Sequence, residues 1–158
     1  MKQYFRSLFP PEFYTRPEYF RALALGLFFL LLLLLQLFHF EKFYPITYGF
    51  SLPGGTVMAA VVAGLIPLLE AAALPYLFSM DVAARVRQIS RVAVVAAPLL
   101  WLAIVVWLAI SGNSLAEVGL FGSTVVTHYG WWVLLFVAML VASAVIVVRE
   151  LPRLRTHA

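Results

Sequence analysis

Four stretches of this chain are apolar and long enough to cross a bilayer, which takes about 20 residues of α-helix. They cover approximately residues 21–38, 56–80, 92–110 and 131–148. Backbone polar groups in hydrocarbon must be satisfied within the segment, so each stretch is expected to be helical. Of 158 residues, 64% are hydrophobic and only 11% are charged, against about 25% charged in soluble domains. The sequence therefore predicts an all-α fold, an integral membrane four-helix bundle.

The basic residues predict how these spans are oriented. Ten of the eleven lysines and arginines flank the spans on what would be one side of the membrane, and Lys42 alone falls on the other. The positive-inside rule then places both termini in the cytoplasm, and we expect a multi-pass protein of the inner (cytoplasmic) membrane. The ten residues are Lys2, Arg6, Arg16, Arg21, Arg85, Arg87, Arg91, Arg149, Arg153 and Arg155.

Three parts of the chain are predicted on this basis. Residues 1–20 form a cytoplasmic interfacial arm, residues 21–150 the four-helix transmembrane domain, and residues 151–158 a cytoplasmic tail. The arm mixes basic residues with seven aromatics, which suits the headgroup layer of a membrane. Its prolines predict short turns rather than one long helix. It contains no nucleic-acid-binding motif, and no nucleic-acid partner is expected.

The first and second spans differ in composition. The first is leucine-rich all round, which predicts broad lipid exposure, and its one polar residue, Gln36, is expected to hydrogen-bond to another helix. The second is rich in small residues, with Ala59 and Ala63, and likewise Ala60 and Gly64, four residues apart. Such spacing lets membrane helices approach closely. The second span is therefore predicted to be the inner helix of the bundle.

Glu70 is the most informative residue of the second span. Ionisable residues at membrane depth are costly and are often functional, so a proton carrier, a cation ligand and a contact to a quinone or lipid headgroup are all open. The structural alternative is a paired or protonated carboxyl that fixes helix register. By count of residues, Trp101 lies at a similar depth and is expected to donate to it. Because desolvation disfavours the charged form, we expect Glu70 to be neutral.

The sequence shows no other convincing catalytic or metal site. His39, Glu41 and His128 are predicted to lie on the outer side, but their spacing is not that of a tight metal site, and none is predicted. Cysteine is absent, which excludes disulfides and thiol nucleophiles. No Ser-His-Asp order, glycine-rich phosphate loop or pair of close carboxylates is present. No catalytic residue is predicted, and the sequence favours a protein that is not an enzyme.

Several short motifs resemble the DoxX-like superfamily of four-helix membrane proteins, and most closely its branch of MauE-like methylamine-utilisation proteins. One match is Arg21-Ala-Leu-Ala-Leu-Gly26 with Glu41-Lys42-Phe43, and a second is Pro67-Leu-Leu-Glu70. The third is Val118-Gly-Leu-Phe-Gly-Ser123 followed by Gly130-Trp-Trp132. The resemblance implies the four-helix fold, and it singles out Pro67, Glu70, Gly119, Phe121 and Gly122 as motif residues.

The third motif resembles a Cys-Gly-Cys-Phe-Gly sequence in which Val118 and Leu120 replace the two cysteines. Relatives that keep the cysteines are associated with redox or disulfide chemistry outside the cytoplasm. Thiol–disulfide exchange needs a thiolate, so this chain is not expected to share that dithiol activity.

Three functions follow from these observations. The first is a non-catalytic accessory subunit or assembly factor of a larger membrane complex, a redox complex if the resemblance holds, with membrane lipids and other integral membrane subunits as partners. The second is a quinone-interacting subunit of a membrane oxidoreductase, in which Glu70 and Trp101 line the quinone pocket. The third is a small transporter, which would have to oligomerise. The first is favoured, and it needs no cofactor.

Overall fold

The computed structural model describes residues 17–38, 40–112, 117–123, 126–128 and 130–151. Its helices are α2 (Pro17–Phe38), α3 (Phe40–Gly49), α4 (Gly55–Leu77), α5 (Ala84–Ser111) and α6 (Trp131–Glu150). All but α3 are long and apolar enough to cross a membrane. Within the described ranges no strand forms, and Glu117 and His128 make only an isolated antiparallel bridge. The prediction of an all-α four-helix membrane bundle is confirmed.

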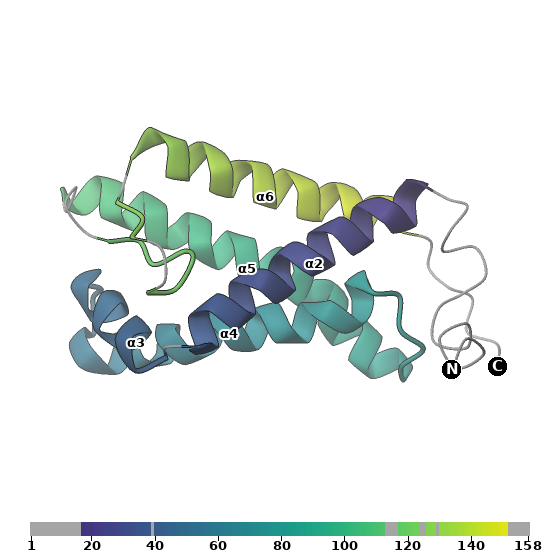
Figure 1. Cartoon of the computed structure of the whole chain (residues 1–158), viewed down its shortest axis with the longest axis horizontal. Helices are drawn as coiled ribbons and strands as arrows, with labels where there is room; N and C mark the ends of the chain where they lie inside the picture. The colour runs from purple at the N-terminus through teal and green to yellow at the C-terminus, as the bar shows by residue number, and fades with distance from the viewer. Residues whose placement is uncertain (1–16, 39, 113–116, 124–125, 129, 152–158) are drawn as a thin grey trace.

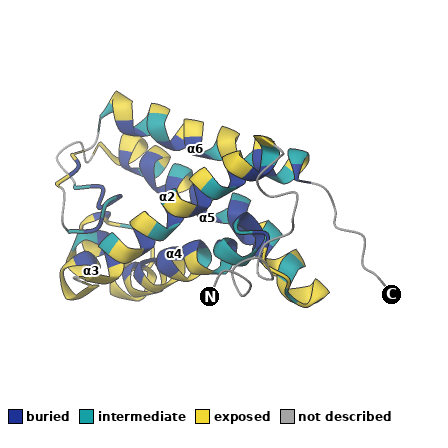
Figure 2. Ribbon diagram, turned by 45° about the vertical axis from the view of Figure 1, so that its right-hand side comes forward, coloured by how far each residue is buried: buried dark blue, intermediate teal, exposed yellow. Residues whose placement is uncertain are grey.

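The four long helices form a closed ring in which each packs against two neighbours. Helix α4 contacts α2 and α5, and α6 contacts α5 and α2. Figure 1 shows that α2 begins, α4 connects to α5 and α6 ends at one end of the bundle. The short helix α3 and the loop after α5 lie at the opposite end (Figure 1). In the ribbon of Figure 2, yellow marks exposed residues along the outer faces of the helices and dark blue marks buried residues along the inner faces.

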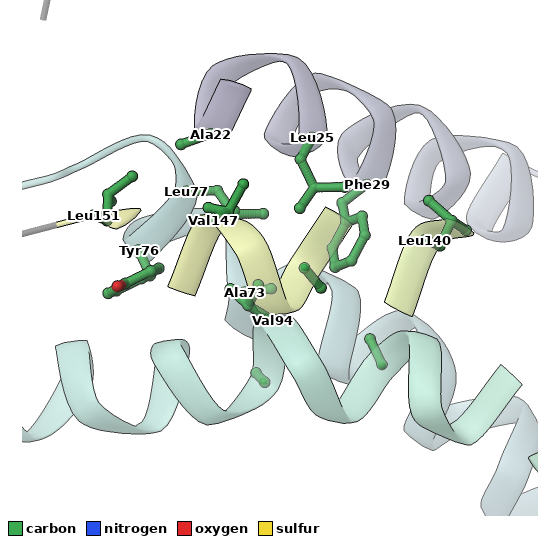
Figure 3. Packing of buried hydrophobic residues seen from close by; sticks show 13 residues of the cluster. Ala22, Leu25, Phe29, Ala73, Tyr76, Leu77, Val94, Leu140, Val147 and Leu151 are labelled. Atoms are coloured by element: carbon green, nitrogen blue, oxygen red, sulfur yellow. The ribbon is translucent and has the colours of Figure 1, made fainter. Parts of the chain in front are cut away.

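Two apolar clusters fill the interior, one toward each end of the bundle. The cluster at the end where α2 begins is built from all four long helices (Figure 3). Its small side chains, which include Ala73, Ala93 and Ala144, let the backbones approach there. The second cluster lies toward α3 and includes Trp101 and Leu120. Of the two pairs of small residues predicted to allow close helix packing, only one faces the interior of the bundle. Ala59 and Ala63 are buried, whereas Ala60 and Gly64 are exposed.

Ser90 of α5 supplies hydrogen bonds to the backbone of α4 beside Pro75. The amide of Tyr76 donates to the Ser90 hydroxyl oxygen at 2.9 Å, and that hydroxyl donates to the carbonyl of Ala73 at 3.2 Å. A proline inside a helix disturbs the local hydrogen-bond ladder, and in a membrane a neighbouring helix must replace the lost partners. Here the Ser90 side chain gives a partner from α5 to the Tyr76 amide, which directly follows Pro75.

Several boundaries differ from those predicted, and the second span ends at Leu77 rather than residue 80. The first helix begins at Pro17 rather than residue 21, because proline is well suited to the first position of a helix. The third span begins at Ala84 rather than residue 92. Its first turns can be helical although they carry arginines, because long arginine side chains extend from the helix to water. Leu151 is buried in the core, so the domain extends one residue past its predicted end. The predicted arm up to residue 16, the tail from residue 152 and His39 lie outside the described residues.

No helix was predicted between the first two spans, but α3 occupies most of this segment. Phe43 and Thr47 lie four residues apart on its buried face. The Thr47 hydroxyl also lies within hydrogen-bond distance of the Ala59 carbonyl, at 3.1 Å. Packing of this one face against α4 therefore stabilises a helix that aromatic residues and an internal Pro45 obscure in the sequence.

Broad lipid exposure was predicted for the first span, and helix α2 is exposed on one face but buried in the bundle on the other. Its buried residues recur at three- and four-residue intervals and include Ala22, Phe29 and Gln36. They pack against α4 and α6. The opposite face is exposed and apolar, so α2 has one face in the bundle and one outside it.

Candidate functional site: a buried polar cluster around Glu70

The Glu70 carboxyl joins three helices through hydrogen bonds to one of its oxygens. Gln36 of α2 donates from Nε2 to Glu70 Oε1 at 3.1 Å, and Trp101 of α5 donates from Nε1 to the same oxygen at 3.2 Å. The three side chains are at most 1% exposed. Both sequence predictions, that Gln36 bonds to another helix and that Trp101 donates to Glu70, are confirmed.

Helical spacing explains why Glu70 points inward. It follows Ile66 by four residues and precedes Ala73 by three, so all three lie on one face of α4. Ile66 belongs to one apolar cluster and Ala73 to the other. The polar cluster therefore lies between the two halves of the core. Pro67 is buried on α4 one turn before Glu70.

A fourth segment, the loop after α5, completes the cluster. Gln36 Nε2 also lies 3.5 Å from the backbone carbonyl of Leu120, which accepts a long hydrogen bond. Leu120 and its neighbour Val118 are fully buried. Both side chains belong to the apolar cluster at this end of the bundle.

Two glycines let this loop fold into the end of the bundle. Gly119 and Gly122 have positive φ angles of 65° and 63°, and the Gly122 amide donates to the Gly119 carbonyl at 2.9 Å. A Cβ at Gly122 would clash with the backbone carbonyl of Leu35 in α2. The loop backbone thus lies directly against α2 next to Gln36, which explains how Leu120 reaches the polar cluster.

The remaining motif residues of the loop pack against other helices. A Cβ at Gly119 would lie 2.8 Å from the Cγ2 of Ile46 in α3. The ring of Phe121 lies 6.2 Å from that of Phe136 in α6, centroid to centroid. The three motif residues Gly119, Phe121 and Gly122 therefore fasten the loop to three different helices.

One oxygen on each of two side chains in the cluster has no hydrogen-bond partner. These atoms, Glu70 Oε2 and Gln36 Oε1, are both buried. An ionised carboxylate only accepts, so it would leave two buried acceptors without a donor. A neutral carboxyl carries one O–H, and a proton on Oε2 would supply the missing donor. This geometry supports the prediction of a neutral Glu70.

The arrangement is better suited to joining helices than to chemistry. A proton relay needs a second titratable group, but the hydrogen-bond partners described for Glu70 are an amide and an indole. Contact with a quinone or a lipid headgroup would require both Glu70 and Trp101 to become accessible, and each is 1% exposed. As the structure stands, their hydrogen-bonding groups face each other in the core.

His39 is outside the described residues, and the described polar residues singled out from the sequence do not assemble into a site. His128 is exposed and pairs through its backbone with Glu117. In the described part of the chain, no three His, Cys, Asp or Glu side chains come close enough together to hold a metal ion.

Sequence reasoning missed three contacts. The Leu120 carbonyl has no signal in the sequence, because any residue supplies a carbonyl. Ser90 gave only a weak signal as a polar residue beside a span. The ion pair of Arg21 with Glu150, at 2.6 Å, could have been found, since opposite charges begin the first span and end the last.

The fold and this buried cluster define the class of protein. Four helices able to cross a membrane, packed in a ring around a few internal hydrogen bonds, form the architecture of a multi-pass α-helical membrane protein. No protein-family model, no curated protein and no solved structure matches the chain.

Proposed function

We propose that the protein is a non-catalytic accessory subunit or assembly factor of a larger membrane complex, held there by helix–helix contacts. Membership of the DoxX-like superfamily, which would make a redox complex the expected setting, is part of this proposal. It draws support from the motif positions, since Glu70 and the loop glycines take part in one buried arrangement. A quinone-interacting subunit is the second candidate only through that resemblance.

The observation that carries the proposal is a row of exposed side chains along α2. The row alternates steps of four and three residues, which is the pattern by which one helix packs into another. It runs the length of the helix, and every member is exposed although the opposite face is buried. The row consists of Phe20, Ala24, Leu27, Leu31, Leu34 and Phe38.

The interior supports the same proposal. The buried polar groups of Glu70, Gln36 and Trp101 bond with one another rather than facing an open pocket. What the chain offers to its surroundings is therefore mainly apolar helix surface and arginine side chains. Such surfaces suit association within a membrane better than turnover of a substrate.

We expect the α2 row to hold the partner subunit. The triple variant Leu27→Ala, Leu31→Ala, Leu34→Ala should lower recovery of that partner at least tenfold, because it removes the central side chains of the row. Tagged full-length protein would be purified from its native host in mild detergent, and partners that copurify in fixed proportion would be quantified. The matched control is Leu135→Ala, Met139→Ala, Ile146→Ala, which removes exposed apolar side chains from α6.

Equal partner recovery with both triple variants would show that the α2 row is covered by lipid, and the docking surface would be wrong. The same preparation tests the second candidate by organic extraction of bound quinone. A monomeric chain that oxidised or reduced a quinone unaided would overturn the accessory-subunit proposal.

The proposed orientation has both termini in the cytoplasm. Among the described residues, Arg21, Arg85, Arg87, Arg91 and Arg149 lie at the end where α2 begins, and Lys42 lies at the end with α3 (Figure 1). This asymmetry follows the positive-inside rule.

Cysteine labelling tests the orientation, because the chain has no native cysteine. Single cysteines at the exposed residues Tyr48 and Asp81 lie on α3 and on the α4–α5 connection. In intact cells, a membrane-impermeant maleimide should label Tyr48→Cys, and Asp81→Cys should react only after the cells are opened. The reverse pattern would contradict the proposed orientation.

A further inference from the structure

A surface groove of about 420 Å³ lies between α5 and α6. Six of its lining residues come from α5 and one, Val148, from α6. The α5 residues recur at three- and four-residue intervals, so they form one continuous stripe of the helix. Gln88 and Arg91 lie at one end of this stripe, and Leu99 lies at the other. The lining surface of the groove is almost entirely apolar, and the end marked by Gln88 and Arg91 is its mouth.

The position of the groove matches one leaflet of a bilayer. Eleven residues separate Gln88 from Leu99, which is about 16 Å along a helix and close to half of a hydrocarbon core of about 30 Å. The mouth lies at headgroup level. Ser90 bonds to the last turn of α4, and Val148 lies two residues before α6 ends. The apolar part thus begins where lipid tails begin.

The charge at the mouth is positive. Arg91 makes no hydrogen bond or ion pair with any residue that the structure describes, but it lies near Tyr76, as does Arg87, whose guanidinium lies over the Tyr76 ring at 5.7 Å. The closest acidic residue along α6, Glu150, is already bonded to Arg21 through both oxygens, at 2.6 and 2.8 Å. Among the described residues Arg91 thus has no carboxylate partner, and guanidinium groups bind phosphate well.

We propose that this groove binds an anionic phospholipid, with the phosphate on Arg91 and one acyl chain lying along α5 toward Leu99. A single acyl chain is thin enough to lie along this apolar stripe, and the phosphate of its headgroup would then lie beside Arg91 at the mouth. The site is distinct from the α2 row that the proposed function assigns to a partner subunit.

Lipid binding to the delipidated full-length protein in mild detergent tests the proposal. Native mass spectrometry would count bound phosphatidylglycerol, or phosphatidylcholine with the same acyl chains. Arg91→Gln should weaken phosphatidylglycerol binding about fivefold, the effect of losing one basic contact. Ala96→Phe should weaken both lipids at least tenfold, because its ring fills the groove. Arg85→Gln and Ala103→Phe make the same changes at exposed positions outside the groove and should stay within twofold of the native protein.

Several results would overturn the proposal. The first is that Arg91→Gln lowers phosphatidylglycerol binding no more than Arg85→Gln does. The second is that the native protein binds both lipids equally. Displacement of the lipid by inorganic phosphate alone would show that the groove does not hold the chain. A change in oligomer mass with Ala96→Phe, at unaltered lipid binding, would identify a protein occupant. These outcomes are independent of the partner-recovery experiment, since none of the variants alters the α2 row.

Discussion

Replacement of Glu70 by lysine should abolish the folded bundle. Gln36 and Trp101 both direct N–H groups at the Glu70 carboxyl oxygen, and a lysine ammonium has only donors to offer them. An uncompensated buried charge costs about 3–5 kcal/mol, against total stabilities of about 5–15 kcal/mol for typical proteins. Size-exclusion chromatography of the detergent-solubilised variant should show loss of the monodisperse peak.

Two matched variants separate charge from position. Glu70→Gln keeps a carbonyl for both donors and adds an amide N–H₂ where Glu70 Oε2 lies, so it should cost about 1 kcal/mol or less. Ala71→Lys places the same ammonium on the exposed neighbouring residue, from which it can extend toward the membrane surface. If Glu70→Lys were as stable as Ala71→Lys, the polar cluster would not be part of the core.

Infrared difference spectra of the native protein and Glu70→Gln test the protonation state of Glu70. We expect the carbonyl band of a protonated carboxyl at neutral pH in the native protein alone. Ionisation below about pH 5, close to the value for glutamate in water, would contradict the neutral assignment. Glu70→Gln is the control for the native protein, because it lacks only this carboxyl.

The centre of the cluster could be predicted from the sequence, because polar side chains in hydrocarbon must find hydrogen-bond partners within the protein. A lone Glu70 and a lone Gln36, each inside an apolar span, must find partners within the protein. The pairing with Trp101 came from counting residues from the end of the apolar run. This count succeeded although α5 begins at Ala84, because the apolar run marks depth in the membrane better than the helix start does.

The rest of the site depends on how the chain folds back on itself. Gln36 and Leu120 are 84 residues apart, and no local pattern predicts that a loop carbonyl will approach a particular side chain. The α3 helix escaped prediction for a related reason, since its stability comes from Phe43 and Thr47 packing against α4 rather than from its own propensity. Burial against distant segments decides both features.

Substitution of Gly122 by alanine should destabilise the protein more than any other glycine-to-alanine change in the described residues with positive φ. Two effects add at this position. An L-residue at φ 63° costs about 1–2 kcal/mol. The new Cβ would also clash with the carbonyl group of Leu35 and lie 3.1 Å from the Cα of Gln36. Backbone atoms of a packed helix cannot move aside as a flexible side chain can, so the loop must shift.

Two other glycines separate strain from collision, because they share the conformation of Gly122 but not its surroundings. Gly112 has φ 69° and nothing within 4 Å of the place an added Cβ would take, and Gly119 has φ 65° and meets the Ile46 side chain at 2.8 Å. Thermal unfolding in detergent should therefore rank the losses as Gly122→Ala, then Gly119→Ala, then Gly112→Ala. A shifted loop would also withdraw the Leu120 carbonyl from Gln36, and the environment of Trp101 should change with it. If Gly122→Ala had the same tryptophan fluorescence and the same melting temperature as Gly112→Ala, the loop would not contribute to the polar cluster.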